Sequence, residues 1–246
     1  MTAGATRTTF VLVHGNAGSF DTWERVQEAL PSTAIALPGF GMMADELHAA
    51  VIDSFDLSGF VGWVVNGVSD SDGPFVLAGN GIGSLLCGRA ALRLGDAVRG
   101  VVMTGPVGLP GGHESLGWLA RRRAGATFLR FAGRTFGRGK FLRDQLAHPE
   151  RDPEAAEILL DALRHARGFH LLARLNRPET LAGLRDLRCP VTVLWGDRDG
   201  VLPVTRAEEF MTHLPPHARL EIVPDAGHAL PLERPDVVAR ALRDLE

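Results

Sequence analysis

At 246 residues, with 45% hydrophobic and 22% charged residues, the chain has the size and composition of one globular domain with a substantial core. A formal net charge of −3 argues against a general nucleic-acid binder, and no apolar run reaches the roughly 20 residues that cross a bilayer. Two cysteines make no disulfide framework, and no Cys/His cluster has zinc-site spacing. We therefore expect a cytoplasmic protein that binds neither metal, nucleic acid nor membrane.

Short apolar runs alternate with longer helical patterns along the chain, which is typical of βαβ units and a mainly parallel sheet. The runs that predict strands are Thr9–Val13, Thr33–Leu37, Pro74–Ala78, Arg99–Met103, Pro190–Trp195 and Arg219–Val223. The patterns that predict helices are Thr22–Leu30, Asp45–Val68, Ile82–Leu94, Val204–Leu214 and Pro235–Leu245. Several strands are continuously apolar, as expected where helices cover both faces of the sheet. The predicted fold is therefore α/β.

One long segment, residues 108–178, breaks this alternation because it contains helical pieces and no convincing strand. We expect residues 1–107 and 179–246 to form the core, and the segment to form a helical lid over the carboxyl ends of the strands. Its aromatic residues, Trp118, Phe128, Phe131, Phe136 and Phe141, favour a largely apolar substrate of moderate size. Eight basic residues between Arg121 and Arg143 are compatible with a solvated helix face, an anionic substrate or a carrier-protein partner.

The first candidate site element is the loop in "VLVHGNAGSFDTW", where a predicted strand ends at His14. A loop of this kind can direct backbone N–H groups at a developing oxyanion, and each well-placed donor is worth roughly 3 kcal/mol. Asn16 and Ala17 are the candidate donors. An ordinary glycine-containing loop between a strand and a helix is the alternative.

The second element is "FVLAGNGIGSLLCG", residues 75–88, in which an apolar strand enters Gly-Asn-Gly-Ile-Gly and then a helix. This pattern is that of a nucleophile elbow, but Gly81 occupies the central position and has no side chain to react. The Ile82 N–H is a candidate second oxyanion donor. Ser84 lies a turn into the helix, which disfavours it as a substitute nucleophile. Because the spacing of the glycines does not match a dinucleotide fingerprint, we expect no cofactor.

The third and fourth elements follow two later strands. Asp197 and Asp199 come directly after the strand that ends at Trp195, and a carboxylate in this place can orient an imidazole and stabilise its cation. His228 follows the last predicted strand in "LEIVPDAGHALPLERPD". A lone histidine in a loop is usually a solvated residue, so the order of all four elements carries more weight than any one of them.

That order, oxyanion loop, elbow, acid and histidine, resembles the α/β-hydrolase superfamily over essentially the whole chain except the lid. "HGNAGSFDTW", "LPGFG" at 37–41, "WGDRD" at 195–199 and the His-x4-Glu-x-Pro pattern from His228 carry the resemblance. It implies an α/β-hydrolase fold, cofactor-free chemistry and a dyad of His228 with Asp199. The residues that we expect to contact substrate are His14, Asn80, Trp118 and Val201.

Gly81 departs from the family pattern, in which this position carries serine or, less often, cysteine or aspartate. One interpretation is an enzyme that works through His228 and Asp199 alone, by elimination, C–C cleavage, isomerisation or activation of water on a small ester or carbonyl compound. A second is a serine hydrolase, such as an esterase, lactonase, thioesterase or C–C hydrolase, whose nucleophile was replaced. A third is a non-catalytic descendant that binds a small molecule or a protein.

Overall fold

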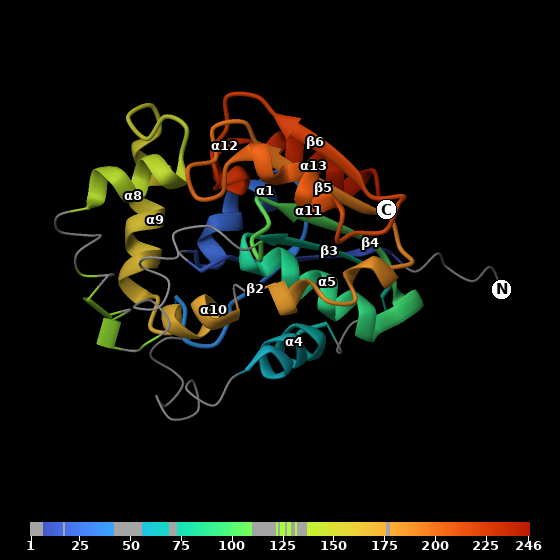
Figure 1. Cartoon of the computed structure of the whole chain (residues 1–246). Helices are drawn as coiled ribbons and strands as arrows, with labels where there is room; N and C mark the ends of the chain where they lie inside the picture. Colours follow the sequence, from blue (N-terminus) through green and yellow to red (C-terminus); the bar gives the residue numbers. More distant parts are fainter. Residues whose placement is uncertain are drawn as a thin grey trace.

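The computed structural model describes residues 7–16, 18–41, 56–68, 73–109, 122, 124–125, 127–128, 131, 137–175 and 178–246. Their central feature is a six-stranded sheet in the order β2-β1-β3-β4-β5-β6, in which all neighbouring strands run parallel (Figure 1). The strands are β1 (Thr9–Val13), β2 (Thr33–Ile35), β3 (Phe75–Asn80), β4 (Val98–Thr104), β5 (Val191–Gly196) and β6 (Arg219–Val223). Parallel pairing places all six carboxyl ends along one edge of the sheet.

Alternating side chains of the central strands enter two separate apolar cores. In β1, Val11 and Val13 belong to one core, while Phe10 and Leu12 belong to the other. This period of two places successive side chains on opposite faces of the sheet. Because both faces are buried, the strands are continuously apolar, as the sequence indicates.

Helices cover both faces of the sheet. The α-helices of the described residues are α1 (Glu24–Ala29), α4 (Leu57–Asn66), α5 (Ile82–Leu94), α8 (Arg138–Gln145), α9 (Pro153–His165), α10 (Phe169–Leu175), α11 (Ala207–Met211), α12 (Leu230–Glu233) and α13 (Pro235–Arg243). Side chains of α4, α5 and α11 lie in the first core, and side chains of α1, α12 and α13 lie in the second. Figure 1 shows α4 and α5 below the sheet and α12 and α13 above it.

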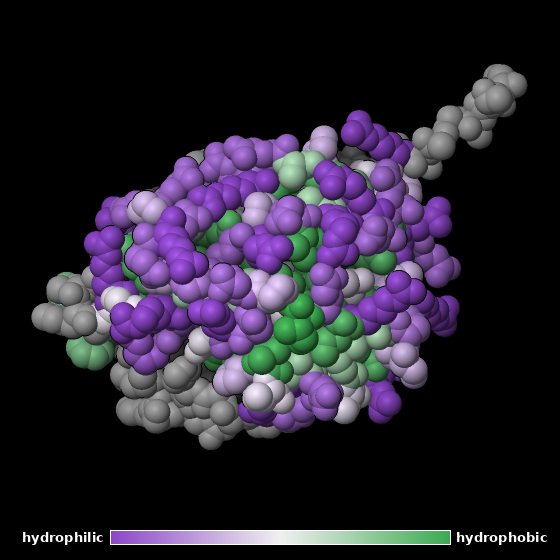
Figure 2. All heavy atoms as spheres, turned by 90° about the horizontal axis from the view of Figure 1, so that it is seen from above, coloured by the Kyte–Doolittle hydropathy of each residue, from purple (hydrophilic) through white to green (hydrophobic). Residues whose placement is uncertain are grey.

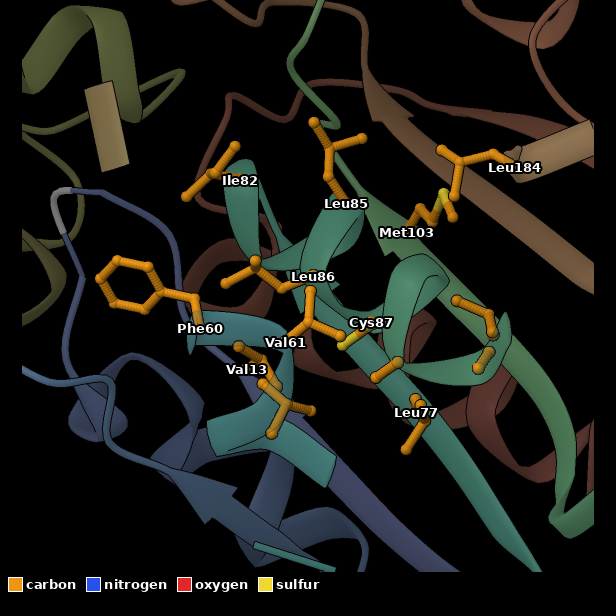
Figure 3. Close-up of a cluster of buried hydrophobic side chains, with 14 of the residues drawn as sticks. Val13, Phe60, Val61, Leu77, Ile82, Leu85, Leu86, Cys87, Met103 and Leu184 are labelled. Carbon is orange, nitrogen blue, oxygen red and sulfur yellow. The ribbon is translucent and has the colours of Figure 1, made fainter. Parts of the chain in front are cut away.

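The first core packs α5 between the sheet and α4. Figure 3 shows Leu86 of α5 near Phe60 and Val61 of α4, with Leu77 of β3 behind the helix. Cys87 is fully buried in this cluster and behaves as a small hydrophobic residue. On the other side of the molecule, polar side chains cover most of the described surface in the space-filling view from above (Figure 2).

Local sequence signals set several helix ends. The side chain of Asp56 caps α4 by accepting from the Gly59 N–H at 2.8 Å, and Asp152 caps α9 in the same way, with Pro153 at the first helical position. The sequence prediction of a mainly parallel sheet flanked by helices is confirmed. The predicted bounds of β1, α5 and β6 match those observed.

Other predicted elements differ from the observed ones at their ends. The predicted helix Thr22–Leu30 begins as a 3-10 turn, Phe20–Trp23, before α1, and the predicted helix Val204–Leu214 is likewise a 3-10 turn followed by α11. Of the predicted helix Asp45–Val68, residues 45–55 lie outside the described part, and α4 occupies the rest.

The range 108–178 is helical where it is described, with α8, α9 and α10 and no strand among those residues. Trp118 and Phe136 lie outside the described part of the chain. Among the residues that are described, no helix is both long enough and apolar enough to cross a membrane.

Candidate active site

Gly81 forms the sharp turn between β3 and α5 at the carboxyl edge of the sheet. Its φ of 55° and ψ of −120° are strained for any residue with a Cβ but accessible to glycine. The Gly81 N–H donates to the Thr104 carbonyl oxygen at 2.9 Å, which ties the turn to the end of β4. The turn therefore has the geometry expected of a nucleophile elbow but carries no nucleophile.

Two more glycines let the turn close so tightly. A Cβ added at Gly79 would lie 2.2 Å from the Gly83 carbonyl carbon, and one at Gly83 would lie 2.3 Å from the Val13 carbonyl oxygen. Real contacts of a Cβ atom are never this short, so strand β3, helix α5 and the end of β1 can pack in this way only with glycine at both positions. The spacing Gly-x-Gly-x-Gly is thus a packing requirement.

His228 and Asp199 form a buried pair beside this turn. The His228 Nδ1–H donates to Asp199 Oδ2 at 2.8 Å, and both residues are only 6% exposed. The other carboxylate oxygen, Oδ1, accepts from the Val201 and Leu202 N–H groups at 2.8 and 2.9 Å. A carboxylate held by three donors stays in one orientation and can orient an imidazole.

The neighbouring carboxylate, Asp197, has a different place. It is exposed, and its Oδ1 accepts from the Ala226 N–H at 3.3 Å. Of the two aspartates in "WGDRD", the structure therefore brings Asp199 to the histidine.

The free nitrogen of His228 faces position 81. A Cβ added at Gly81 would lie 3.2 Å from His228 Nε2, with the Gly15 Cα as another close atom at 3.9 Å. Any reacting atom held above Gly81 is therefore within reach of Nε2. With Asp199 on the opposite nitrogen, His228 has the arrangement of a general acid–base.

Of the three candidate oxyanion donors, Ile82 lies next to Gly81, Asn16 lies in the loop after β1, and Ala17 is not described. Ile82 is the first residue of α5, where an N–H group has no acceptor within the helix. Asn16 lies in the loop after β1, closed by a Gly18 N–H to Gly15 carbonyl hydrogen bond of 3.2 Å. The Asn16 Oδ1 atom is buried without a partner among the described residues. Ala17 lies outside the described part of the chain.

The expected substrate contact of His14 is wrong, because the residue has no exposed surface. Its Nε2 accepts from the Leu37 N–H at 3.0 Å, so its proton is on Nδ1, which donates to the Gly15 carbonyl oxygen at 2.9 Å. Burial lowers the pKa of His14 from 6.5 to about 4, although the hydrogen bond to Gly15 acts in the opposite direction. His14 is a neutral, structural residue beneath the loop.

The folding stability should therefore depend on pH through His14. In the unfolded chain its imidazole gains a proton near pH 6.5, whereas in the folded protein it does so only near pH 4. Because the unfolded state binds more protons in this window, the free energy of unfolding falls as the pH drops, by about 3 kcal/mol in total. Urea titrations between pH 7 and pH 4 should show a shallower slope for His14→Asn than for the wild type. Equal slopes for His14→Asn and the wild type would contradict the assignment.

Asn80 was also expected to contact substrate, but its side chain is hydrogen-bonded within the protein. The Nδ2 group donates to the His228 carbonyl oxygen at 2.9 Å and to Thr104 Oγ1 at 3.0 Å, and the residue is 5% exposed. It is a positioning residue that holds the histidine loop against the end of β4. Ser84 is fully buried, and its hydroxyl donates to the Gly79 carbonyl oxygen at 2.7 Å, which excludes it as a nucleophile.

Of the remaining expected substrate contacts, Val201 is half-buried next to Asp199, and Trp118 is among the residues not described. Phe128 and Phe131, two of the predicted lid aromatics, are about 60% exposed, and Phe141 packs partly against a cluster of α8, α9 and α12. These described aromatics do not form one apolar wall over His228.

Comparison with known proteins decides the family. A model described as "Alpha/beta hydrolase family" matches residues 10–241. The chain belongs to the alpha/beta hydrolase family. No curated protein matches the chain.

Solved structures show the same fold for this alpha/beta hydrolase. A thermophilic esterase from Thermogutta terrifontis is 23% identical, with a TM-score of 0.75 over 97% of this chain and 89% of its own. An alpha/beta hydrolase fold protein from Burkholderia ambifaria is 20% identical, with a TM-score of 0.75 over 96% and 90%. An esterase from Exiguobacterium antarcticum is 17% identical, with a TM-score of 0.73 over 97% and 91%.

One residue at the centre of this alpha/beta hydrolase site was missed by the sequence analysis. Gly105 follows β4 directly, and a Cβ added there would lie 2.8 Å from His228 Nδ1 and 3.2 Å from Asp199 Oδ2. The dyad thus rests against the Gly105 backbone. A glycine right after a buried strand, next to the strand that leads into the elbow, is the signal that points to it.

Proposed function

We propose that this alpha/beta hydrolase transfers protons on a small, largely apolar ester or carbonyl compound, with His228 as general acid–base and Asp199 as its orienting carboxylate. The single observation that carries the proposal is the 3.2 Å between His228 Nε2 and the Cβ position of residue 81. The base is aimed at the point where a nucleophile would stand, and Gly81 contributes no side chain there. Substrate or water then occupies that point.

The chemistry follows from the two ends of the imidazole. While Nδ1–H donates to Asp199, Nε2 takes a proton from the substrate carbon next to the carbonyl, or from a water molecule. When a C–H bond is broken, its electron pair moves onto the carbonyl oxygen as an enolate forms; when water attacks, its oxygen bonds to the carbonyl carbon and the C=O electron pair moves onto that oxygen. In both cases the Ile82 N–H can donate to the developing charge.

In isomerisation the His228 proton returns to another carbon, and in elimination the enolate electron pair expels a leaving group, which takes the proton. In C–C cleavage Nε2 instead takes the proton of a substrate hydroxyl, whose electron pair forms a new carbonyl as the C–C bond breaks, and the released carbanion takes the proton. In hydrolysis the proton goes to the alcohol that departs when the carbonyl re-forms.

The magnitudes are adequate without a covalent step. A positioned histidine contributes about 10²–10⁴-fold as general acid–base. Oxyanion donors add roughly 3 kcal/mol each when they are well placed. A reaction at an acidic carbon or at an activated ester needs no more than these two effects together, whereas an unactivated amide would need a nucleophile as well.

The test is a panel of small esters and ketones incubated in D2O and followed by NMR for deuterium uptake next to the carbonyl, elimination and hydrolysis. We expect His228→Gln to lower the wild-type rate by about 10²–10⁴-fold. The control His217→Gln makes the same replacement at an exposed histidine and should leave the rate unchanged. Covalent labelling of the wild type by a fluorophosphonate would contradict a mechanism without a nucleophile.

Among the reactions of this proposal, hydrolysis of an ester by water that His228 activates has a further observation in its favour. What favours it is the presence of esterases among the similar folds. The same panel separates these reactions, because hydrolysis releases acid and alcohol without deuterium uptake at carbon. If no compound reacts and a bound compound keeps its affinity in His228→Gln, the chain is a binding protein and not an enzyme.

A further inference from the structure

The carboxyl end of α8 lies against both loops of the His228–Asp199 dyad. The Gly200 N–H donates to the Asp144 carbonyl oxygen at 3.2 Å, and the Ala229 N–H donates to the Gln145 carbonyl oxygen at 2.9 Å. Gly200 follows Asp199 directly, and Ala229 follows His228 directly. One short stretch of backbone therefore holds the neighbour of each dyad residue.

The end of α8 approaches the two dyad loops so closely that Gly200 and Gly227 cannot carry a Cβ. A Cβ added at Gly200 would lie 2.7 Å from the Asp144 Cα, and one at Gly227 would lie 2.7 Å from the Gln145 carbonyl oxygen and 2.8 Å from the Ala147 N. Backbone meets backbone at both places. A shift of residues 144–147 would therefore be transmitted directly to the two loops.

Glu233 bridges the same two segments with its two carboxylate oxygens. Oε1 accepts from the Ala147 N–H and Oε2 from the Gly227 N–H, each at 2.7 Å. Burial raises the pKa of Glu233, while these two hydrogen bonds act in the opposite direction. Within the described residues it forms no ion pair, so both of its oxygens are available to the backbone groups.

Apolar packing and a charged clamp support the bridge. Leu142, Leu146 and Leu159 pack with Ala229 and Leu232 in one cluster, where α8 and α9 meet α12 (Figure 1). Arg25 adds a second tie, because its Nη1 donates both to Asp152, the cap of α9, and to the Leu232 carbonyl oxygen at 2.9 Å.

We propose that Glu233 is a positioning residue through which α8 and α9 set the alignment of His228 with Asp199. Its carboxylate accepts from both the Gly227 and the Ala147 N–H groups, so the position of the histidine loop follows the position of residues 144–147. A ligand that moves α8 and α9 would then change the reactivity of His228 without touching it. The inference rests on the proposed function insofar as His228 is the group that reacts.

The first test is Glu233→Gln. An amide has one acceptor oxygen and one NH2 group, so either the Ala147 or the Gly227 N–H faces a donor and loses its hydrogen bond. We expect the downfield proton resonance of the His228 Nδ1–H to shift or broaden and the activity of the proposed reaction to fall by about tenfold or more. The control Glu221→Gln removes a carboxylate that pairs with Arg240 on the surface and should leave both unchanged.

The second test, Ala147→Pro, breaks the bridge from the α8–α9 side, because the proline ring carbon Cδ replaces the N–H and displaces the Glu233 Oε1 atom that accepts from it. Leu146 is already extended, with φ of −121° and ψ of 140°, as a residue before proline must be. We expect the His228 resonance to change in this variant too. An unchanged resonance in both folded variants would overturn the proposal. A changed resonance in Glu233→Gln but not in Ala147→Pro would also overturn it, because Glu233 would then act only on the histidine loop and not through residues 144–147. Because the resonance is read without substrate, this result stands apart from any failure of the proposed function.

Discussion

Gly81→Ser is expected to raise the rate at which this alpha/beta hydrolase cleaves esters far above the wild-type rate. The new Cβ would lie 3.2 Å from His228 Nε2, so the hydroxyl can donate to that nitrogen while Asp199 holds the other. A complete triad exceeds the same site without its nucleophile by about 10⁶-fold. We expect a gain of at least about 10³-fold in p-nitrophenyl acetate hydrolysis, which is a small part of that difference. The measurement is the rate of nitrophenolate release, together with fluorophosphonate labelling of the variant.

The matched control for this variant is Gly81→Ala. Both replacements place a Cβ at φ of 55°, and both should lose about 1–3 kcal/mol of unfolding free energy to backbone strain. Only the serine variant adds a hydroxyl, so only it should gain esterase activity and react with the fluorophosphonate. The alanine variant should also lose the proposed proton transfer, because its methyl group fills the space in front of Nε2. A folded Gly81→Ser protein without any gain would mean that His228 does not reach the elbow in solution.

Gly83→Ala is expected to have the largest effect on folding. Its methyl carbon would lie 2.3 Å from the Val13 carbonyl oxygen and 2.6 Å from that of His14, so α5 and β1 would have to separate. These elements form the centre of the first core, and the loss should exceed about 4 kcal/mol or prevent folding altogether. The measurement is the urea or thermal unfolding midpoint, or the soluble yield if no folded protein is obtained.

The control for this substitution is Gly62→Ala in the middle of α4. There the nearest atom to an added Cβ is Arg93 Nη1 at 3.8 Å, so nothing clashes. Alanine in a helix interior is more stable than glycine by about 0.5–1 kcal/mol, and this variant should be slightly stabilised. If Gly83→Ala unfolds at the same urea concentration as the wild type, the close packing of α5 on β1 is contradicted.

Sequence patterns were most informative where the physical cause is local. The strand β1 and the helix α5 have the bounds predicted for them, because a short continuous apolar run and a longer helix-forming run between glycines are both local signals. The predicted strand Thr33–Leu37 shows the limit. It ends at Ile35, and the Leu37 N–H donates to the His14 side chain and not to a neighbouring strand. No feature of residues 33–37 themselves announces that partner.

The candidate site also combines features that local sequence predicts with features that depend on distant residues. The glycine spacing 79-81-83 identifies the elbow from the sequence, because an added Cβ is excluded or strained at each of the three positions. The pairing of His228 with Asp199, by contrast, could be named only through a family resemblance, since 28 residues of chain separate them and spacing does not say which aspartate turns inward. The structure shows Asp199 buried against the ring and Asp197 exposed.

What the sequence by itself determined is therefore the order of strands and helices along the chain, the tight turn at residues 79–83 and the glycine at its centre, all of which depend on a residue and its near neighbours. What only the tertiary structure decided is which polar side chains are hydrogen-bonded within the protein and which face the space above Gly81. It assigned His14 and Asn80 to the protein's own backbone, brought Gly105 under the dyad, and joined Glu233 to Ala147. The physical reason is that hydrogen bonds and close approaches between distant segments depend on how the layers pack, and that packing is a property of the whole chain.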